Sequence, residues 1–151
     1  MAIRVELVEW TKAHKAIRHI RDTVFVREQG VPLELEWDGQ DPLCRHVLAW
    51  NDQGEPIGTG RLYREGMQAR LARMAVLKEY RGRGVGRALL RALLAAAEEQ
   101  GLIRVYLSAQ VPAIGFYEKA GFSVTGELFQ DAGMPHRPMA LTLPRAQTEP
   151  R

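Results

Sequence analysis

The chain has little cysteine and no long apolar run. Cys44 is the only cysteine among 151 residues, so an intramolecular disulfide is excluded and nothing favours an oxidising compartment. No stretch of about 18 apolar residues occurs, which argues against a membrane-spanning helix. The first ten residues include Arg4, Glu6 and Glu9, so we expect no secretory signal. These absences predict a cytoplasmic protein with no membrane partner.

Neither sign of charge dominates. There are 21 Lys and Arg against 18 Asp and Glu, and this net charge of +3 suits an anionic ligand but is too small to indicate nucleic acid. A nucleic-acid site on Arg81, Arg83, Arg87 and Arg91 is the least favoured alternative, because no exposed aromatic residues alternate with these arginines. The length predicts one domain over residues 1–144, followed by a flexible tail at 145–151.

Glycine is concentrated in one stretch, Tyr80-Arg81-Gly82-Arg83-Gly84-Val85-Gly86-Arg87-Ala88-Leu89-Leu90. Glycine adopts backbone conformations closed to other residues and leaves no Cβ between the amides and a ligand. Apolar residues then recur at spacings of three and four, which predicts a helix that ends near Gly101. Because amides at a helix N-terminus lack intrahelical partners, this junction predicts a phosphate site.

Two common phosphate motifs do not fit this stretch. A Walker loop starting at Gly82 needs Gly-Lys-Ser/Thr from position 87, where the chain has Arg87-Ala88-Leu89. The dinucleotide fingerprint starting at Gly82 needs its third glycine at the same arginine. The stretch is therefore expected to be a phosphate site of a kind other than these two.

The remaining pattern predicts an α/β fold. Alternating apolar residues indicate a first strand over residues 3–7, and helical spacing continues to residue 28, before an acidic loop. A short helix is expected at 113–120. Further strands are expected at 46–50, 56–64, 69–76, 103–108, 123–130 and 137–143. We expect a mixed, mostly antiparallel sheet of about seven strands with helices on both faces.

Two motifs carry a family resemblance. Arg81, Gly84 and Gly86 fill the pattern Arg/Gln-x-x-Gly-x-Gly/Ala, and residues 109–122 resemble Asn-x-x-Ala-x-x-Phe/Leu-Tyr-x-x-x-Gly-Phe. In this order and at this spacing they resemble the two signatures of the GNAT superfamily of N-acetyltransferases. The resemblance covers about residues 3–143. It implies the GNAT fold, in which the fourth and fifth strands splay apart around acetyl-coenzyme A, and it implies no metal.

The resemblance implies where acetyl-coenzyme A binds. Its pyrophosphate lies on the glycine-rich backbone, and its pantetheine arm pairs with the strand before it as another strand would. The positions carried over are Met74, Ala75, Val76, Arg81, Gly82, Arg83, Gly84, Val85, Gly86, Arg87, Gln110, Ala113, Phe116 and Tyr117. Gln110 departs from the family, which commonly has Asn there.

The catalytic residues are also implied by the resemblance. Tyr117 matches the position from which GNAT enzymes present a phenol to the coenzyme A sulfur as general acid, although a core tyrosine is the alternative. The preceding strand has no Glu for a general base, so we place Glu28 and His136 at the acceptor as candidates for that role. Asp38 and His46 are second choices for binding the acceptor.

The segment between Glu28 and Cys44 contains acidic residues but no Lys or Arg. We expect it to form the rim of the acceptor site and to attract a cationic amine, with a solvated loop as the alternative.

The leading hypothesis is an N-acetyltransferase in which a primary amine attacks acetyl-coenzyme A directly. A non-catalytic acyl-coenzyme A-binding or sensing module is the alternative. The acceptor stays open among a polyamine, an amino sugar, an antibiotic, a peptide N-terminus and a lysine side chain. Homodimers are common in the family, and the final strands could supply the interface.

Overall fold

The computed structural model describes residues 2–144. The expected tail at 145–151 lies outside the described residues. The described part contains one eight-stranded sheet, with strand order β1-β2-β3-β4-β5-β8-β6 and β7 paired to β8. Its strands are β1 (Arg4–Val8), β2 (Arg45–Trp50), β3 (Pro56–Glu65), β4 (Gln68–Val76), β5 (Arg104–Gln110), β6 (Ser123–Val124), β7 (Phe129–Asp131) and β8 (Met134–Thr142).

Helical elements connect and cover these strands. The α-helices are α1 (Trp10–Arg21), α2 (Leu33–Glu36), α3 (Val85–Glu99) and α4 (Ile114–Lys119). A π-helix, η1 (Asp22–Glu28), continues α1, and short 3-10 turns are η2 (Asp41–Leu43), η3 (Lys78–Tyr80) and η4 (Val111–Ala113). No helix in residues 2–144 combines the length and apolar character needed to cross a membrane.

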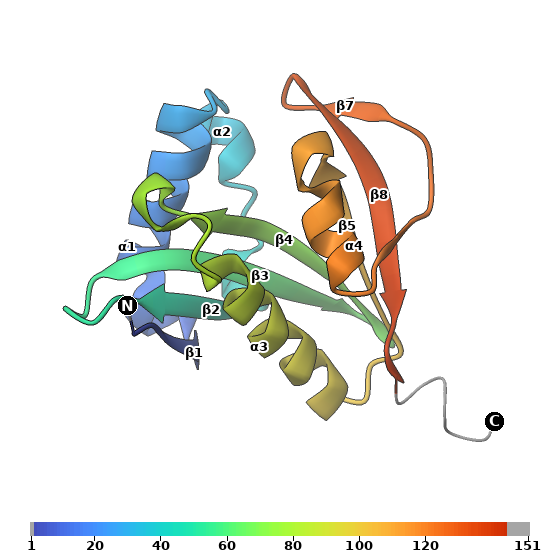
Figure 1. The fold of residues 1–151 in the computed structure, drawn as a ribbon, viewed down its shortest axis with the longest axis horizontal. Helices are drawn as coiled ribbons and strands as arrows, with labels where there is room; N and C mark the ends of the chain where they lie inside the picture. Colours follow the sequence, from blue (N-terminus) through green and yellow to red (C-terminus); the bar gives the residue numbers. More distant parts are fainter. Residues whose placement is uncertain (1, 145–151) are drawn as a thin grey trace.

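The predicted mixed sheet is confirmed, and it is splayed at its centre. All strand pairs are antiparallel except β4 with β5, which pair in parallel only from Gln68↔Arg104 to Arg70↔Tyr106. Beyond these residues the two strands separate, so that β1–β4 with α1 and β5–β8 with α4 form two arms (Figure 1). The edge of β4 beyond Arg70 that faces β5 therefore has no strand partner in the described chain.

Helices cover both faces of the sheet, as expected, and each face has its own core. Helix α3 places Leu89 and Leu93 against Val47 and Leu62 in the larger apolar cluster. Helix α1 packs on the opposite face, where Ile17 and Ile20 meet Leu48 and Ala75. Burying apolar area on both faces stabilises the sheet by roughly 25 cal/mol per Å² removed from water. The cores leave the splayed end of the sheet free for a site.

Three predicted elements differ from the structure. The helix expected up to residue 28 is α-helical only to Arg21, and its last seven residues form the π-helix η1. The segment expected as one strand over residues 123–130 is divided into β6 and β7, because residues 125–128 leave the sheet between them. The acidic segment contains α2 and η2 instead of one extended loop.

Candidate active site

Two cavities lie along the splay and meet at its centre. The first, of about 310 Å³, is lined by the end of β4, the glycine-rich loop and α4. The second, of about 390 Å³, is lined by η1, α2, β4, β5 and the β7–β8 hairpin. Met74, Ala113 and Tyr117 line both. We call them the cradle cavity and the acceptor cavity.

The cradle cavity contains most of the residues predicted to bind a cofactor. Its lining includes Met74, Ala75, Val76, Arg81, Gly82, Gly84, Val85, Gly86, Ala113, Phe116 and Tyr117. Arg83 and Arg87 are exposed next to it but do not line it, and Gln110 lines the acceptor cavity. The sequence motif thus folds into one continuous wall.

The glycine-rich loop has the backbone expected of an anion site. Gly82 and Gly84 have φ angles of 75° and 84°, in the left-handed region that other residues rarely adopt. Gly84 is the N-cap of α3, and no side chain among residues 2–144 caps this helix end. The first amides of α3 can therefore donate to phosphate oxygens, and the helix dipole favours negative charge there.

A β-bulge shapes the wall of β4 next to Tyr117. Thr59 pairs with Ala75 and Arg61 with Ala72, so Gly60 alone stands opposite both Arg73 and Met74. Arg73 has φ of 56°, which is unusual for an arginine. A Cβ on Gly60 would lie 2.5 Å from Met74 Sδ, so the glycine leaves room for the Met74 side chain to pack across the bulge. The bulge ends regular pairing at the point where the cavities meet.

Tyr117 is placed as an acid would be. It is 8% exposed, and its ring contacts Phe116 and Phe122 edge-on, with ring centroids 5.0 and 5.7 Å apart. Burial raises the pKa of the phenol well above its usual range, so it stays protonated at neutral pH. It is in the core and also lines both cavities, so its core position does not exclude the role of general acid, which stays a prediction.

The acidic segment is not a free negative rim. Its acidic residues join three arginines in a closed ring of alternating charge, which we call the charge ring: Arg21, Glu36, Arg73, Asp38, Arg61 and Asp41. Arg21 Nε lies 2.5 Å from Glu36 Oε1, and Arg21 Nη1 lies 2.6 Å from Asp41 Oδ1. Arg61 Nη1 donates to the same Asp41 oxygen at 2.9 Å. The expectation of an acidic surface that attracts cations is therefore wrong for these three carboxylates.

Asp38 lines the acceptor cavity as predicted, but its carboxylate already forms ion pairs with Arg61 and Arg73. Burial alone would raise its pKa, yet hydrogen bonds from Arg61 and from the Gln40 amide outweigh burial and lower it to about 2. Asp38 is therefore ionised and neutralised by Arg61, which makes it a poor partner for an ammonium group.

The two predicted histidines have opposite environments. His136 is 7% exposed, lines the acceptor cavity and places Nδ1 2.8 Å from the carbonyl of Met134. Because a carbonyl only accepts, Nδ1 carries the hydrogen, and Nε2 of the neutral ring is left as the acceptor. His136 thus has an acceptor nitrogen and lies in the wall of the acceptor cavity.

His46 is not a substrate-binding residue, which corrects the prediction. It is 1% exposed, lines neither cavity and stacks on Trp10. Its Nε2 donates to the Asp41 carbonyl at 2.8 Å, and burial lowers its pKa. Its role is to pack behind the charge ring.

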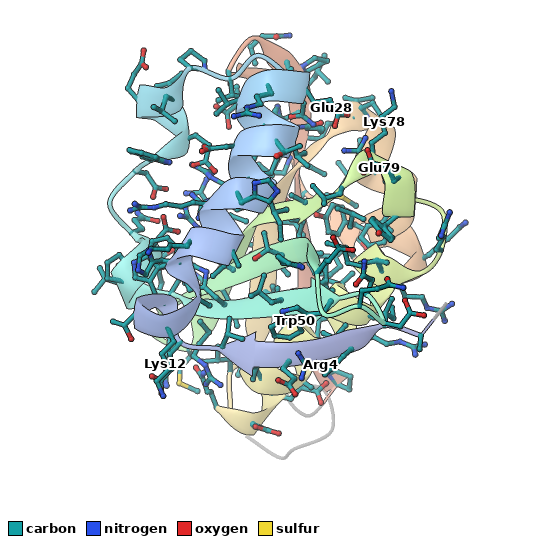
Figure 2. All side chains as sticks on the ribbon, turned by 90° about the vertical axis from the view of Figure 1, so that its left-hand side faces the viewer. Arg4, Lys12, Glu28, Trp50, Lys78 and Glu79 are labelled. Atoms are coloured by element: carbon teal, nitrogen blue, oxygen red, sulfur yellow. The ribbon has the colours of Figure 1, made fainter. Side chains whose placement is uncertain are left out.

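Glu28 lies outside both cavities. It forms a two-pronged ion pair with Arg81, at 2.7 and 2.8 Å, and this hydrogen bonding lowers its pKa. Figure 2 shows Glu28 next to Lys78 and Glu79, at the outer corner where η1 meets η3. The structure therefore gives no support to Glu28 as a general base, and connects it to the cradle loop.

A second contact, made by the residue that follows η1, joins the two arms of the sheet. Gln110 donates from Nε2 to Gln29 Oε1 at 3.0 Å, so the side chain at the unusual motif position holds the chain that follows η1. The predicted contact of Gln110 with a cofactor stays a prediction.

Sequence reasoning missed the three arginines of the charge ring and Arg70. Arg61, Arg70 and Arg73 all line the acceptor cavity. In the sequence, Arg70 and Arg73 lie on the strand where a Glu was expected, and no motif marks them or Arg61 as cavity residues. The alternation of side chains along two adjacent strands could have found Arg61 and Arg70. Arg61 pairs with Ala72, and Arg70 pairs with Tyr63, two residues away on each strand. Both arginines therefore point to the same face of the sheet, the one beneath α1.

Cysteine and metal chemistry receive no support from the geometry. Burial raises the pKa of the Cys44 thiol to about 11, which keeps it protonated, and its Sγ donates to the Gln40 carbonyl. Among the residues that the structure describes, no group of three or more His, Cys, Asp and Glu is arranged to hold a metal ion.

The chain is similar to known proteins in sequence and in structure. The model of the acetyltransferase (GNAT) domain matches residues 41–143. The uncharacterised N-acetyltransferase YjcF of Bacillus subtilis is 38% identical over 122 residues, which cover 80% of this chain and 86% of that protein. An acyl-CoA N-acyltransferase from Pseudomonas aeruginosa has a TM-score of 0.83 and 30% identity, and the match covers 93% of this chain and all of that one. Escherichia coli ElaA also has a TM-score of 0.83, with 27% identity over 93% and 99% of the two chains.

Proposed function

The chain belongs to the GNAT acetyltransferase family, and from that premise we propose that it transfers an acetyl group from acetyl-coenzyme A to a primary amine. The amine attacks the thioester directly while both molecules are bound. The observation that carries the proposal is the meeting of the two cavities at Met74, Ala113 and Tyr117. A donor in one and an amine in the other would have their reactive groups at that junction.

The residues of the cradle cavity fit acetyl-coenzyme A. The positive φ angles of Gly82 and Gly84 present the loop amides, and a Cβ at either glycine would meet no atom within 4 Å, so the space above the loop is open. The unpaired edge of β4 offers N–H and C=O groups to the amides of the pantetheine arm. When bound, the donor supplies an acyl group activated as a thioester.

Two residues would handle the protons. His136 Nε2 can accept a proton from the ammonium form of the acceptor, directly or through water, which leaves a neutral nucleophile. Tyr117 holds a proton at its hydroxyl, because its pKa is raised by burial, and can donate it to the departing thiolate. A backbone N–H of β4 next to the bulge can polarise the thioester carbonyl.

The first test is unfolding of the purified protein with and without acetyl-coenzyme A. A ligand at about 100 times its dissociation constant adds roughly 2.7 kcal/mol of stability. We expect this gain in the parent protein and its loss in Gly84→Trp, whose indole would fill the open loop. No gain in the parent would overturn the proposal.

Gly101→Trp is the matched control. Gly101 has φ of 73° and open space around it, like Gly84, but lies after the other end of α3. The two variants should lose similar stability without ligand, since both force a side chain into the left-handed region. Only Gly84→Trp should lose the ligand effect. Release of free thiol in the presence of amines then tests turnover, and binding without turnover across a wide amine panel would favour a sensing module.

A further inference from the structure

We infer that the acceptor carries a carboxylate as well as its amine, and that Arg70 binds this carboxylate. The inference rests on the proposed acetyl transfer and names the substrate class of the same site. It starts from the charges of the acceptor cavity, which differ from those that the acidic segment suggested. The acceptor class is decided by which charges in the cavity remain without a partner.

The charge ring is internally neutral. Its three arginines balance its three carboxylates, and each member has partners within the ring on both sides. Glu36 and Asp41 are 2% and 6% exposed, so their charges are turned inward. A polycationic acceptor such as a polyamine would find no free carboxylate in the ring and would face Arg61 and Arg73 there.

Outside the ring, the cavity lining contains one more cation and one more anion. Arg70 is exposed on β4, and Asp131 is exposed on β7 at the opposite wall. Within the described residues neither makes an ion pair. The acceptor cavity therefore offers one free positive and one free negative charge, and an occupant with both a carboxylate and an ammonium group complements them.

The position of Arg70 agrees with this orientation. It lies opposite Tyr106, at the last pair of β4 with β5, and Ser108, Gln110 and His136 follow on the same face of the sheet. The junction of the cavities begins a few residues further along β4, at Met74. A carboxylate at Arg70 thus leaves the amine to extend toward His136 and Tyr117, with Asp131 on the far wall.

The body of the acceptor is expected to be small and apolar. A cavity of about 390 Å³ falls in the range of small-molecule sites, which are roughly 300–1,000 Å³. Phe25, Val31 and Leu35 line its wall on the side of η1 and α2. These features favour a small amino acid with an apolar side chain over a protein lysine or an amino sugar.

The test compares matched acceptors in the free-thiol assay with acetyl-coenzyme A. L-leucine is paired with isoamylamine and L-phenylalanine with phenethylamine, which lack only the carboxylate; spermidine is the polycation. Rates are corrected to the concentration of neutral amine. We expect the carboxylate to raise kcat/KM by about 10- to 100-fold, the range for a hydrogen bond to a charged group. The gain should appear mainly as a lower KM.

Arg70→Gln should abolish the difference within each pair by lowering kcat/KM for the amino acid, and Arg70→Lys should restore part of it. Arg91→Gln, which removes an exposed arginine of α3, is the control and should keep the full difference. Equal rates for acid and amine, or faster acetylation of spermidine, would overturn the inference and leave the proposed function standing. No thiol release with any acceptor would overturn the proposed function, and the inference with it.

Discussion

The two cavities of this protein are built in different ways. The cradle cavity is lined by one nearly continuous part of the chain, residues 74–86, together with α4. It acts through backbone amides and glycine conformations. The acceptor cavity takes residues from nine separate elements, and charged side chains are prominent in its lining. The first is therefore readable as a motif, whereas the second depends on which distant side chains meet.

This difference teaches where a charge pattern misleads. A run of acidic residues forms a negatively charged surface only if no cationic side chains fold against it. Here Arg21 comes from α1, Arg61 from β3 and Arg73 from the bulge in β4, and together they neutralise the run. None is within ten residues of the carboxylate that it pairs with, so no local pattern contains the ring. The following predictions test whether the two cavities are separable.

The largest effect is expected for Tyr117→Phe, at the junction. Removing the general acid should lower kcat by about 10²- to 10⁴-fold. The ring and its contacts with Phe116 and Phe122 remain, so stabilisation by acetyl-coenzyme A should be unchanged. The measurements are thiol release and unfolding with ligand. Tyr80→Phe, which removes another phenol of the cradle cavity, is the control and should retain most activity; equal losses in both would remove Tyr117 from the mechanism.

Breaking the charge ring should destabilise the protein and spare the cradle. Arg21→Ala leaves Glu36 and Asp41 buried without a cation between them, which costs about 3–5 kcal/mol for a buried pair. Urea unfolding measures the loss, and Lys15→Ala on the exposed side of α1 should change it by less than about 0.5 kcal/mol. The stabilisation added by acetyl-coenzyme A should persist in Arg21→Ala. Its disappearance would show that the two cavities are coupled.

His136→Gln should lower turnover by about 10²-fold, at the lower end for a general base because water can partly replace the imidazole. Thiol release with an amine acceptor measures the loss. Glu28→Gln is the matched comparison, since Glu28 was the other candidate base and lies outside the cavity. We expect less than about a threefold change, as for an exposed ion pair. A larger loss of turnover in Glu28→Gln than in His136→Gln would instead indicate Glu28 as the general base.

The smallest effect is an acid dependence of stability. The pKa of Asp38 is lowered to about 2 in the folded protein, against its ordinary 3.8, and that of Asp41 is also lowered. A carboxyl group whose pKa is lowered in the folded protein stabilises the fold at pH values above its ordinary pKa. This contribution disappears as pH falls from about 4 to 2. Unfolding in urea across this range should show the loss, and Asp38→Asn should make it shallower. An unchanged slope in that variant would place the acid sensitivity elsewhere.

The sequence predicted the cradle and the mixed sheet because both depend on local chemistry, whereas the splay of the sheet was implied only by the family resemblance. Gly82 and Gly84 have positive φ angles in the turn that enters α3, a conformation that favours glycine, and the alternation of the strands was regular. The division of the strand at 123–130 was not predicted, because β-propensity in Phe129 and Gln130 does not report that residues 125–128 leave the sheet. His46 and His136 could not be told apart, since only the fold decides which lies behind Trp10 and which lines a cavity.

The open edge of β4 has a consequence for how the protein behaves in solution. Unpaired N–H and C=O groups on a strand are a template onto which another chain can add, and this is a common start of aggregation. The bulge at Arg73 interrupts the regular spacing of that edge, and the facing arm of β5 and α4 narrows the approach to it. If acetyl-coenzyme A covers this edge as proposed, the protein should self-associate more readily without it, and its solubility at high concentration should depend on that ligand.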